Sequence, residues 1–282
     1  MSRIQEILKR AEREGSVHRT RPFVAEGPAV GSPSAAAAAT VPMPPMPPLQ
    51  TPEPRSVETA LDRRLVAAFS PQSLAAEQYR SLRTRVKSAE QGRAMRTIVI
   101  TSPNKGDGKS LTAANLALTM AQEFQHRVLL VDGDLRRPAI HGLFGISGTP
   151  GLSDVLQGGA AIDDALVAVP EHSLTVLPSG RVPSHPAELL GSTAMRRLLE
   201  TLRTRFDRIL IDMPPVAPLA DVSIALGMVD GLLMIVRAGV TPKPAIERAL
   251  SGLDLSKVLG LVLNDAGTGS ASYGYGHEYV AG

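Results

Sequence analysis

A glycine-rich segment with a lysine and a serine is the clearest chemical feature of the chain. The apolar run Arg96–Thr101 leads into a loop that ends in Gly106-Asp107-Gly108-Lys109-Ser110, and a helical pattern begins there. Glycines let backbone N–H groups turn toward phosphate oxygens, and the N-terminus of the following helix adds further donors. In such a loop the lysine reaches the β- and γ-phosphates of a nucleotide, and the serine hydroxyl binds Mg²⁺. The segment therefore predicts a site for ATP and Mg²⁺ at Lys109 and Ser110.

This loop departs from the usual P-loop spacing at its start. In the pattern G-x-x-x-x-G-K-[ST] the first glycine falls at position 103, which is Pro103 in this chain. The strand before the loop, the intact Gly-Lys-Ser and the helix after it still favour phosphate binding over an incidental turn. The residues expected to contact ATP are Lys105, Gly106, Asp107, Gly108, Lys109, Ser110 and Leu111.

Carboxylates end two further apolar runs. Asp132 and Asp134 follow Leu129–Val131, and Asp212 follows Ile209–Ile211. Because the carboxyl ends of parallel strands meet at one edge of a sheet, we expect the three to share the crevice of the glycine-rich loop. There, carboxylates hold Mg²⁺ or its water ligands, and one can accept a proton from an incoming hydroxyl. We predict a metal site of Ser110, Asp132 and Asp212, and we leave open whether Asp132 or Asp134 is the base. Taken singly, each aspartate is as well explained as a cap or turn residue.

The elements that must position these residues follow an alternating pattern. Short apolar runs separated by helical stretches predict a parallel sheet covered on both faces, with its ligand at the carboxyl ends of the strands. The expected strands are Arg96–Thr101, Arg127–Val131, Leu174–Leu177, Arg208–Ile211, Leu232–Val236 and Val258–Leu263. The expected helices are Val57–Ala68, Ser73–Glu90, Ser110–Phe124, Ala194–Arg205 and Pro244–Leu253.

Composition excludes several classes of protein. The chain has 282 residues and no Cys, which rules out disulfide scaffolds and thiolate metal sites and suits a reducing, cytoplasmic compartment. Residues 1–94 carry 14 basic and 9 acidic side chains, whereas residues 95–282 carry 16 and 18. The basic excess is too small and too local to predict nucleic-acid binding by the main body.

Composition also divides the chain. Residues 1–15 form an amphipathic pattern, which indicates either a frayed solvated end or a docking helix for a partner or membrane surface. Residues 16–56 are rich in Pro and Ala, so we expect an extended linker that cannot span a bilayer. The predicted catalytic domain covers residues 57–265. Residues 266–282 are expected to be a flexible tail, and they contain three of the four tyrosines, Tyr273, Tyr275 and Tyr279.

At these motifs the chain resembles a known family, the bacterial tyrosine kinases of exopolysaccharide and capsule synthesis, of the CpsD/CapB type. The resemblance runs from about Leu74 to the C-terminus. It is carried by Gly106–Ser110, Asp132–Pro138, Gly151–Leu156, His185–Leu190, Ile211–Pro215 and Leu259–Asn264.

The resemblance implies a fold and a role for each matching residue. The fold would be a P-loop NTPase of the MinD/ParA-like type, a mostly parallel twisted sheet with helices on both faces. Lys109 and Ser110 would bind ATP and Mg²⁺, Asp132, Asp134 and Asp212 would be the kinase carboxylates, and Asn264 would lie near the adenine. Tyr273, Tyr275 and Tyr279 would be the autophosphorylated cluster. The segment with Glu77, Arg80 and Arg83 resembles the family's ring-forming E-x-x-R-x-x-R motif; without the resemblance, a solvated salt-bridge face is the favoured explanation.

The glycine-rich loop also departs from the family. Lys105 stands where the family usually has Pro, and Asn104 stands where MinD-type ATPases carry a second, signature lysine. Whether Lys105 reaches a phosphate is therefore open.

Three functions are compatible with these motifs. The first is an ATP-dependent autokinase that phosphorylates its tail in trans within a ring, controls exopolysaccharide synthesis, and reaches the inner face of the membrane through a membrane-bound polysaccharide co-polymerase or activator protein. The second is a MinD/ParA-like ATPase switch at a membrane or on DNA. The third is a scaffold that binds nucleotide without turnover. The second aspartate of Asp132-Gly133-Asp134, the tyrosine cluster and the missing signature lysine favour the kinase.

Overall fold

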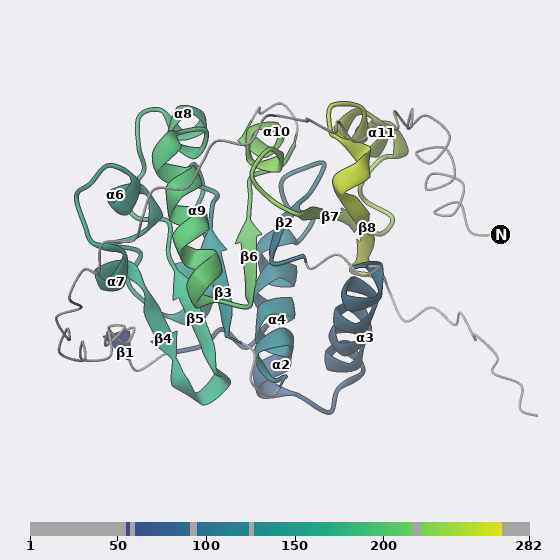
Figure 1. Ribbon diagram of the computed structural model, residues 1–282. Helices are drawn as coiled ribbons and strands as arrows, with labels where there is room; N and C mark the ends of the chain where they lie inside the picture. Colours follow the sequence, from purple (N-terminus) through teal and green to yellow (C-terminus); the bar gives the residue numbers. More distant parts are fainter. Residues whose placement is uncertain (1–54, 57–59, 91–94, 124–126, 217–220, 267–282) are drawn as a thin grey trace, which may run out of the picture. The chain divides into compact units, whose positions relative to one another are not determined.

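A mostly parallel sheet of eight strands lies between two layers of helices in the computed structural model (Figure 1). The structure describes residues 55–56, 60–90, 95–123, 127–216 and 221–266. These residues all fall within one compact unit, Glu53–Gly282. The predicted N-terminal helix, most of the predicted linker and the tyrosine-rich tail lie outside the described residues.

The strand order is β1-β4-β5-β3-β6-β2-β7-β8. Strands β5, β3, β6, β2, β7 and β8 run parallel, whereas β4 pairs antiparallel with β5 and parallel with β1. The strands are β1 (Arg55–Ser56), β2 (Thr97–Thr101), β3 (Val128–Asp132), β4 (Val167–Val169), β5 (Leu174–Leu177), β6 (Arg208–Asp212), β7 (Gly231–Arg237) and β8 (Val258–Asn264).

The six predicted strands are confirmed, and two short ones were not predicted. Strand β4 has three residues and β1 has two, which is too short for a periodic pattern to show. Arg55 and Ser56 belong to the predicted linker, but their backbones pair with Val167 and Ala168. The linker prediction is therefore wrong at its C-terminal end.

The helices cover both faces of the sheet. Those near the predicted ranges are α3 (Leu74–Ala89), α4 (Lys109–Ala121), α9 (Thr193–Arg205) and α11 (Lys243–Ser251). Shorter ones are α2 (Val66–Phe69), α5 (Ile140–Phe144), α6 (Leu152–Leu156), α7 (Ile162–Ala165), α8 (Pro186–Leu190) and α10 (Asp221–Leu226), with 3₁₀ turns at Pro170–His172 and Leu255–Lys257. None of the described helices is both long enough and apolar enough to cross a lipid bilayer.

The predicted helix over Val57–Ala68 is wrong for its described part before Val66. Asp62 Oδ1 accepts the backbone N–H of Arg64 at 2.8 Å, and the Asp62 N–H donates to the carbonyl of Leu143 at 2.8 Å. Aspartate side chains that bond a nearby backbone N–H compete with helix formation. Only α2, one turn long, remains helical in this segment.

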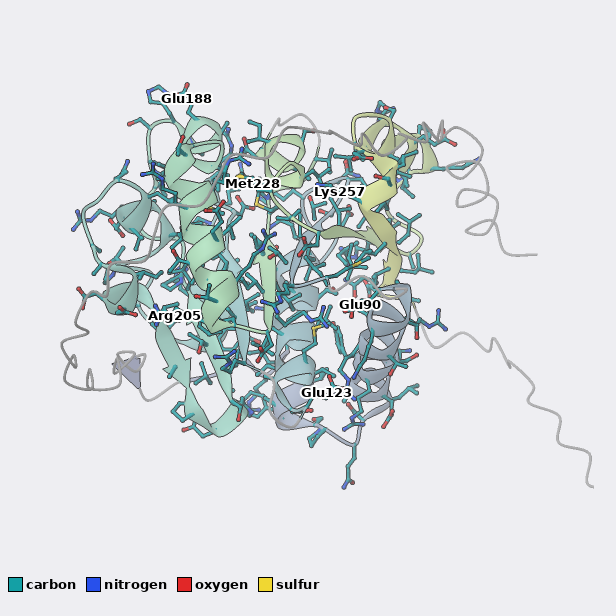
Figure 2. The ribbon with its side chains drawn as sticks, viewed as in Figure 1. Glu90, Glu123, Glu188, Arg205, Met228 and Lys257 are labelled. Atoms are coloured by element: carbon teal, nitrogen blue, oxygen red, sulfur yellow. The ribbon has the colours of Figure 1, made fainter. Side chains whose placement is uncertain are left out.

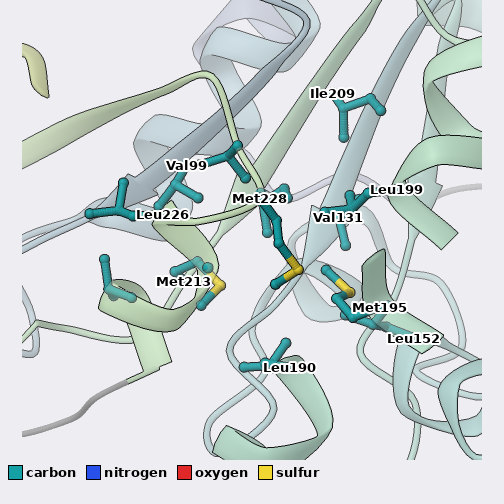
Figure 3. Packing of buried hydrophobic residues seen from close by; sticks show 14 of the residues in the cluster. Val99, Val131, Leu152, Leu190, Met195, Leu199, Ile209, Met213, Leu226 and Met228 are labelled. Carbon is teal, nitrogen blue, oxygen red and sulfur yellow. The ribbon is translucent and has the colours of Figure 1, made fainter. Parts of the chain in front are cut away.

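Successive side chains along the central strands point to opposite faces of the sheet, so they belong to two separate hydrophobic cores. Val99, Val131 and Ile211 pack with α6, α8, α9 and α10, whereas Ile100 and Leu130 pack with α2, α4 and α5. Figure 3 shows the first core, where Met195, Met213 and Met228 meet residues of the sheet. At the edge of that layer Arg205, labelled in Figure 2, joins α9 to α7 through an ion pair with Asp163 at 2.6 Å.

A buried asparagine connects the helix after the glycine-rich loop to α2. Asn115 of α4 is 1% exposed. Its Oδ1 accepts the N–H of Ala67 at 3.1 Å, and its Nδ2 donates to the carbonyls of Arg64 at 3.2 Å and Leu111 at 3.0 Å. Asn115 of α4 therefore bonds both α2, at Ala67, and the segment that precedes it, at Arg64.

We expect Asn115→Leu to lower the free energy of unfolding by about 2 to 4 kcal/mol, because it leaves the buried Ala67 N–H unpaired and removes the partner of the Arg64 carbonyl. Urea titration of the full chain measures the change. Thr119→Val is the matched control, since the buried Thr119 hydroxyl bonds only the Asn115 carbonyl one turn earlier in the same helix. Equal losses in the two variants would contradict this role for Asn115.

Candidate active site

Two glycines with left-handed backbones shape the loop between β2 and α4. Gly106 has φ of 88° and Gly108 has φ of 94°, values that other residues rarely adopt. A Cβ atom on Gly108 would also stand 2.0 Å from Nδ2 of Asn264. The two glycines of Gly-x-Gly-Lys-Ser therefore follow from backbone geometry and, at Gly108, from the close approach of Asn264.

The first two side chains of α4 meet carboxylates from two other strand ends. Lys109 Nζ lies 2.9 Å from Oδ2 of Asp134 and 3.2 Å from Oδ1 of Asp212. The Ser110 hydroxyl donates to Oδ2 of Asp212 at 2.6 Å. The structure thus brings together four of the side chains that the sequence singled out.

Strand register explains this meeting. Asp132 and Asp212 are paired neighbours at the ends of β3 and β6, and Asp212 also pairs with Ile100 of β2. The N–H of Gly133 donates to the Asp212 carbonyl at 2.8 Å, so the turn after β3 stays close to β6. Asp134 follows this turn and reaches Lys109.

Asp132 bonds the start of α5. Its Oδ2 accepts the N–H groups of Ala139 and Ile140, each at 3.0 Å, where α5 begins. The side chain is fully buried, and burial, together with the nearby charge of Asp212, raises the pKa of Asp132 to about 7. Asp132 thus anchors the start of α5.

The pKa values of Asp212 and Lys109 depend on the charges around them. Burial raises the pKa of Asp212, and the charge of Asp134 adds to this, while Lys109 and the Ser110 hydroxyl oppose it. Burial alone would lower the pKa of Lys109, but the carboxylates of Asp212 and Asp134 outweigh it and raise that pKa. Lys109 therefore stays charged and compensates two buried carboxylates.

A cavity of about 840 Å³ opens in front of these side chains. Lys109, Ser110, Leu111 and Asp134 line it, whereas Asp132 does not. Four cationic residues also line it: Arg64, Lys105, Arg136 and Arg137. Sequence reasoning missed the three arginines as site residues. Arg136 and Arg137 were visible as neighbours of Asp134, but no local signal marked Arg64.

Asp107 and Asn264 stabilise the glycine-rich loop through hydrogen bonds. Asp107 is 2% exposed, and its carboxylate accepts the N–H of Asn104 at 2.8 Å and the hydroxyl of Thr241 at 2.7 Å. Asn264 Nδ2 donates to the Asp107 carbonyl at 3.0 Å, at the edge of a second cavity of about 490 Å³ that Tyr79 also lines. The side chain of Asp107 thus serves the loop itself.

The remaining predicted site residues lie apart from the main cavity. Glu77 and Arg80 form an ion pair on the exposed face of α3. Arg83 Nη1 instead donates to the Thr119 carbonyl at 2.8 Å, which fastens α3 to α4. The three tyrosines of the tail fall outside the described residues.

The donor set of the cavity suits Mg²⁺ that is shared with a nucleotide. Within the described ranges, the structure contains no cluster of three or more carboxylate or histidine ligands that would hold a metal without help. Magnesium in such sites takes one or two protein oxygens and completes its shell with phosphates and water. Ser110 and Asp212 supply two such oxygens 2.6 Å apart, beside the loop that would hold the phosphates.

We expect Lys109→Met to destabilise the nucleotide-free protein by about 3 kcal/mol at pH 8, and by less at pH 5. Without the lysine, which opposes the effect of burial, the pKa of Asp212 rises further above its value in the unfolded chain. The folded state then keeps protons that the unfolded state loses, so stability falls as the pH rises above about 4. Urea titrations at pH 5 and pH 8 measure this difference. Lys87→Met removes an exposed ion pair with Glu123 and should change little at either pH; a Lys109→Met loss that is the same at both pH values would contradict the charge account.

Comparison with known proteins identifies the fold. Residues 95–252 match the family model described as AAA domain. The kinase domain of the Escherichia coli tyrosine kinase ETK superposes with a TM-score of 0.69 at 29% identity, over 75% of this chain and 84% of that domain. The ATP complex of Cyanothece McdA(D38A) superposes with a TM-score of 0.51 at 26% identity, over 60% of this chain and 70% of McdA. The predicted P-loop NTPase fold of the MinD/ParA-like type is confirmed.

Sequence similarity narrows the family further. The tyrosine-protein kinase YwqD of Bacillus subtilis is 38% identical over 218 residues, which are 76% of this chain and 92% of YwqD. The match therefore spans nearly the whole relative, including the glycine-rich loop and the strand ends that carry the three aspartates. The chain belongs to the AAA-domain P-loop proteins and, within them, to the bacterial tyrosine-protein kinases.

Proposed function

We propose that this chain is an ATP-dependent kinase that phosphorylates its own Tyr273, Tyr275 and Tyr279. The observation that carries the proposal is the pairing of Lys109 with Asp134 and Asp212 at the cavity wall, in a chain of the tyrosine-kinase family. The position of the tail supports it. The tail starts at residue 266, two residues after Asn264, which contacts the glycine-rich loop.

The reaction moves one phosphoryl group and one proton. The bond between the γ-phosphorus of ATP and the oxygen that bridges to the β-phosphate breaks, and ADP keeps that electron pair. A bond between the phosphorus and the tyrosine oxygen forms. Because a tyrosine hydroxyl has a pKa near 10, its proton must leave as the bond forms. Lys109 and the N–H groups of the loop stabilise the charge on the transferring group.

Asp134 is the better placed proton acceptor of the two candidates. Asp134 lines the cavity, whereas Asp132 does not. Oδ2 of Asp132 instead accepts two backbone N–H groups where α5 begins. Asp134 is held in turn by Lys109 and by the N–H of Arg137 at 3.0 Å. We assign the base to Asp134 and an anchoring role to Asp132.

Mg²⁺ would be held by Ser110 and Asp212, with Asp132 behind them, and when bound it would neutralise charge on the phosphates. The hydroxyl of Ser110 and the carboxylate of Asp212 are already fixed to each other before a nucleotide arrives. Lys105 and the backbone around Gly106 and Gly108 would complete the phosphate contacts, and Asn264 would lie near the adenine.

Beyond its own chemistry, the kinase would act in trans within a ring and regulate exopolysaccharide or capsule synthesis. Glu77, the exposed member of the Glu77–Arg80 pair on α3, would face a neighbouring subunit, while Arg83 holds α3 in place. The ETK structure is named as the kinase domain of a larger kinase. By analogy we propose a membrane-bound co-polymerase or activator as the partner that brings this chain to the inner face of the membrane. A pull-down of this chain from membranes would test whether it has such a partner.

A nucleotide switch of the MinD/ParA-like type is the second candidate, because the McdA–ATP complex shares the fold. Such a switch would hydrolyse ATP to phosphate without labelling its tail. The kinase would instead leave phosphate on tyrosine.

We expect the full chain to gain phosphotyrosine on the tail when it is incubated with Mg-ATP. Lys109→Met should abolish the labelling, because it removes the group that faces the phosphates, and a triple Tyr→Phe change at 273, 275 and 279 should abolish it with the site intact. Mass spectrometry of the tail peptides measures both. ATP hydrolysis with no phosphotyrosine would favour the switch instead.

The same samples test the ring. Three phosphotyrosines bring about −5 of charge to the tail at pH 7, which should weaken its return to a cavity lined by Asp134 and shift the ring toward smaller assemblies. Light scattering before and after phosphorylation gives the subunit mass. A mass that phosphorylation leaves unchanged would rule out this release.

We expect Asp134→Asn and Asp132→Asn to differ in what they lose. Asp134→Asn should slow autophosphorylation by about 100-fold with stability nearly kept, because it removes the proton acceptor. Asp132→Asn should lower stability as well, because its carboxylate anchors the start of α5. Initial rates and urea titrations of both variants measure this; a greater rate loss in a stable Asp132→Asn protein would reverse the assignment.

A further inference from the structure

One arginine at the cavity is held in a fixed orientation by a buried carboxylate. Arg136 lines the cavity and its side chain is 37% exposed, whereas the side chain of Asp221 is 1% exposed. Nε of Arg136 donates to Oδ2 of Asp221 at 2.9 Å, and Nη2 donates to Oδ1 at 3.3 Å. The two residues are 85 positions apart, and Asp221 begins α10.

This side-on pairing leaves donors free on the other side of the guanidinium. An arginine has five N–H donors, of which the two bonds to Asp221 use one on Nε and one on Nη2. Nη1 has no hydrogen-bond partner among the described residues. Because the two bonds fix the plane of the group, its free N–H groups point in a set direction with little further loss of entropy.

The other cations of the cavity differ from Arg136. The exposed Arg64 is paired with Asp62, and the guanidinium of Arg137 makes no hydrogen bond within the part of the chain that the structure describes. Lys109 is engaged with Asp134 and Asp212 at the wall of the cavity. Arg136 is thus the cation that combines a buried clamp with free donors.

Its place along the cavity indicates what those donors would bind. Arg136 follows Asp134 by two residues, and both side chains line the cavity that Lys109 also lines. The proposed proton acceptor, the lysine that would face the nucleotide and Arg136 therefore share one cavity. A tyrosine that reaches Asp134 must enter this cavity, where Arg136 can meet the group that it receives.

We propose that Asp221 positions Arg136 so that its free N–H groups bind the phosphoryl group while it passes from ATP to tyrosine. This inference rests on the proposed kinase function and adds a substrate-contacting residue and a positioning residue to it. Arg136 breaks no bond and takes no proton. It stabilises negative charge on the phosphoryl oxygens as the bond to ADP lengthens and the bond to the tyrosine oxygen forms. Nucleotide affinity would come from the glycine-rich loop and depend little on Arg136.

The test compares phosphorylation rate with nucleotide affinity in the full chain. Arg136→Gln and Asp221→Asn should each lower kcat for tail phosphorylation by about 10- to 100-fold, by analogy with the loss of one oriented donor. The Kd for ATP, measured by calorimetry, should change less than about threefold in both variants, a factor worth under 1 kcal/mol. Arg136→Lys should restore little, because an ammonium group cannot pair side-on with Asp221 and keep an oriented fork.

The double variant separates positioning from general stability. If Asp221 acts through Arg136, adding Asp221→Asn to Arg136→Gln should cause no further loss of rate. A matched control exists at the start of β3, where Arg127 pairs side-on with Asp207 through Nε at 3.2 Å and Nη2 at 3.0 Å, far along the strand from Asp134. Asp207→Asn should leave kcat within about twofold of the wild type, since losing an exposed ion pair is worth little.

Several results would overturn the inference. If the wild type is active and the rate of Arg136→Gln stays within threefold of it, the inference is refuted while the kinase proposal stays intact. Additive losses in the double variant would have the same consequence. Should Asp221→Asn fail to fold, Arg136→Gln alone decides, because its side chain is partly exposed. A wild type that makes no phosphotyrosine would instead refute the kinase function itself.

Discussion

The charge balance around Lys109 is the interaction on which the rest of the site depends. One ammonium group compensates Asp134 at 2.9 Å and Asp212 at 3.2 Å, in a place where neither carboxylate has much contact with water. Buried charges are tolerated when they are paired and hydrogen-bonded, and they are costly otherwise. The glycine-rich loop, the turn after β3 and the end of β6 must therefore meet at one point.

The parallel sheet makes that meeting possible at little cost. Asp132 and Asp212 are register partners, and the buried strands β2, β3 and β6 fix their ends with respect to one another. Oδ2 of Asp132 accepts two N–H groups at the start of α5, whereas Asp134 lines the cavity. Two aspartates only two residues apart thus acquire different environments, and different roles follow from that difference.

Much of this was predictable from local sequence. The six long strands and the four long helices have periodic patterns, and the loop motif and the strand-end aspartates point to one edge of a parallel sheet. Long-range partners were not predictable. Asp221 lies 85 residues from Arg136, and Asp62 replaces a helix with a turn through a contact to Leu143. The different roles that we propose for Asp132 and Asp134 also depend on which of the two bonds α5. The spacing of these residues in the sequence carries no information on that.

We propose that the site at Lys109 of one copy of the chain phosphorylates the tail of another copy. Mixing the Lys109→Met chain, which has an intact tail, with the triple Tyr→Phe chain, which has an intact site, tests it most directly. In the presence of Mg-ATP, mass spectrometry should find phosphate on Tyr273, Tyr275 or Tyr279 of the Lys109→Met chain, and only in the mixture. Phosphate on that chain alone, or none in the mixture while the wild type labels itself, would contradict the account.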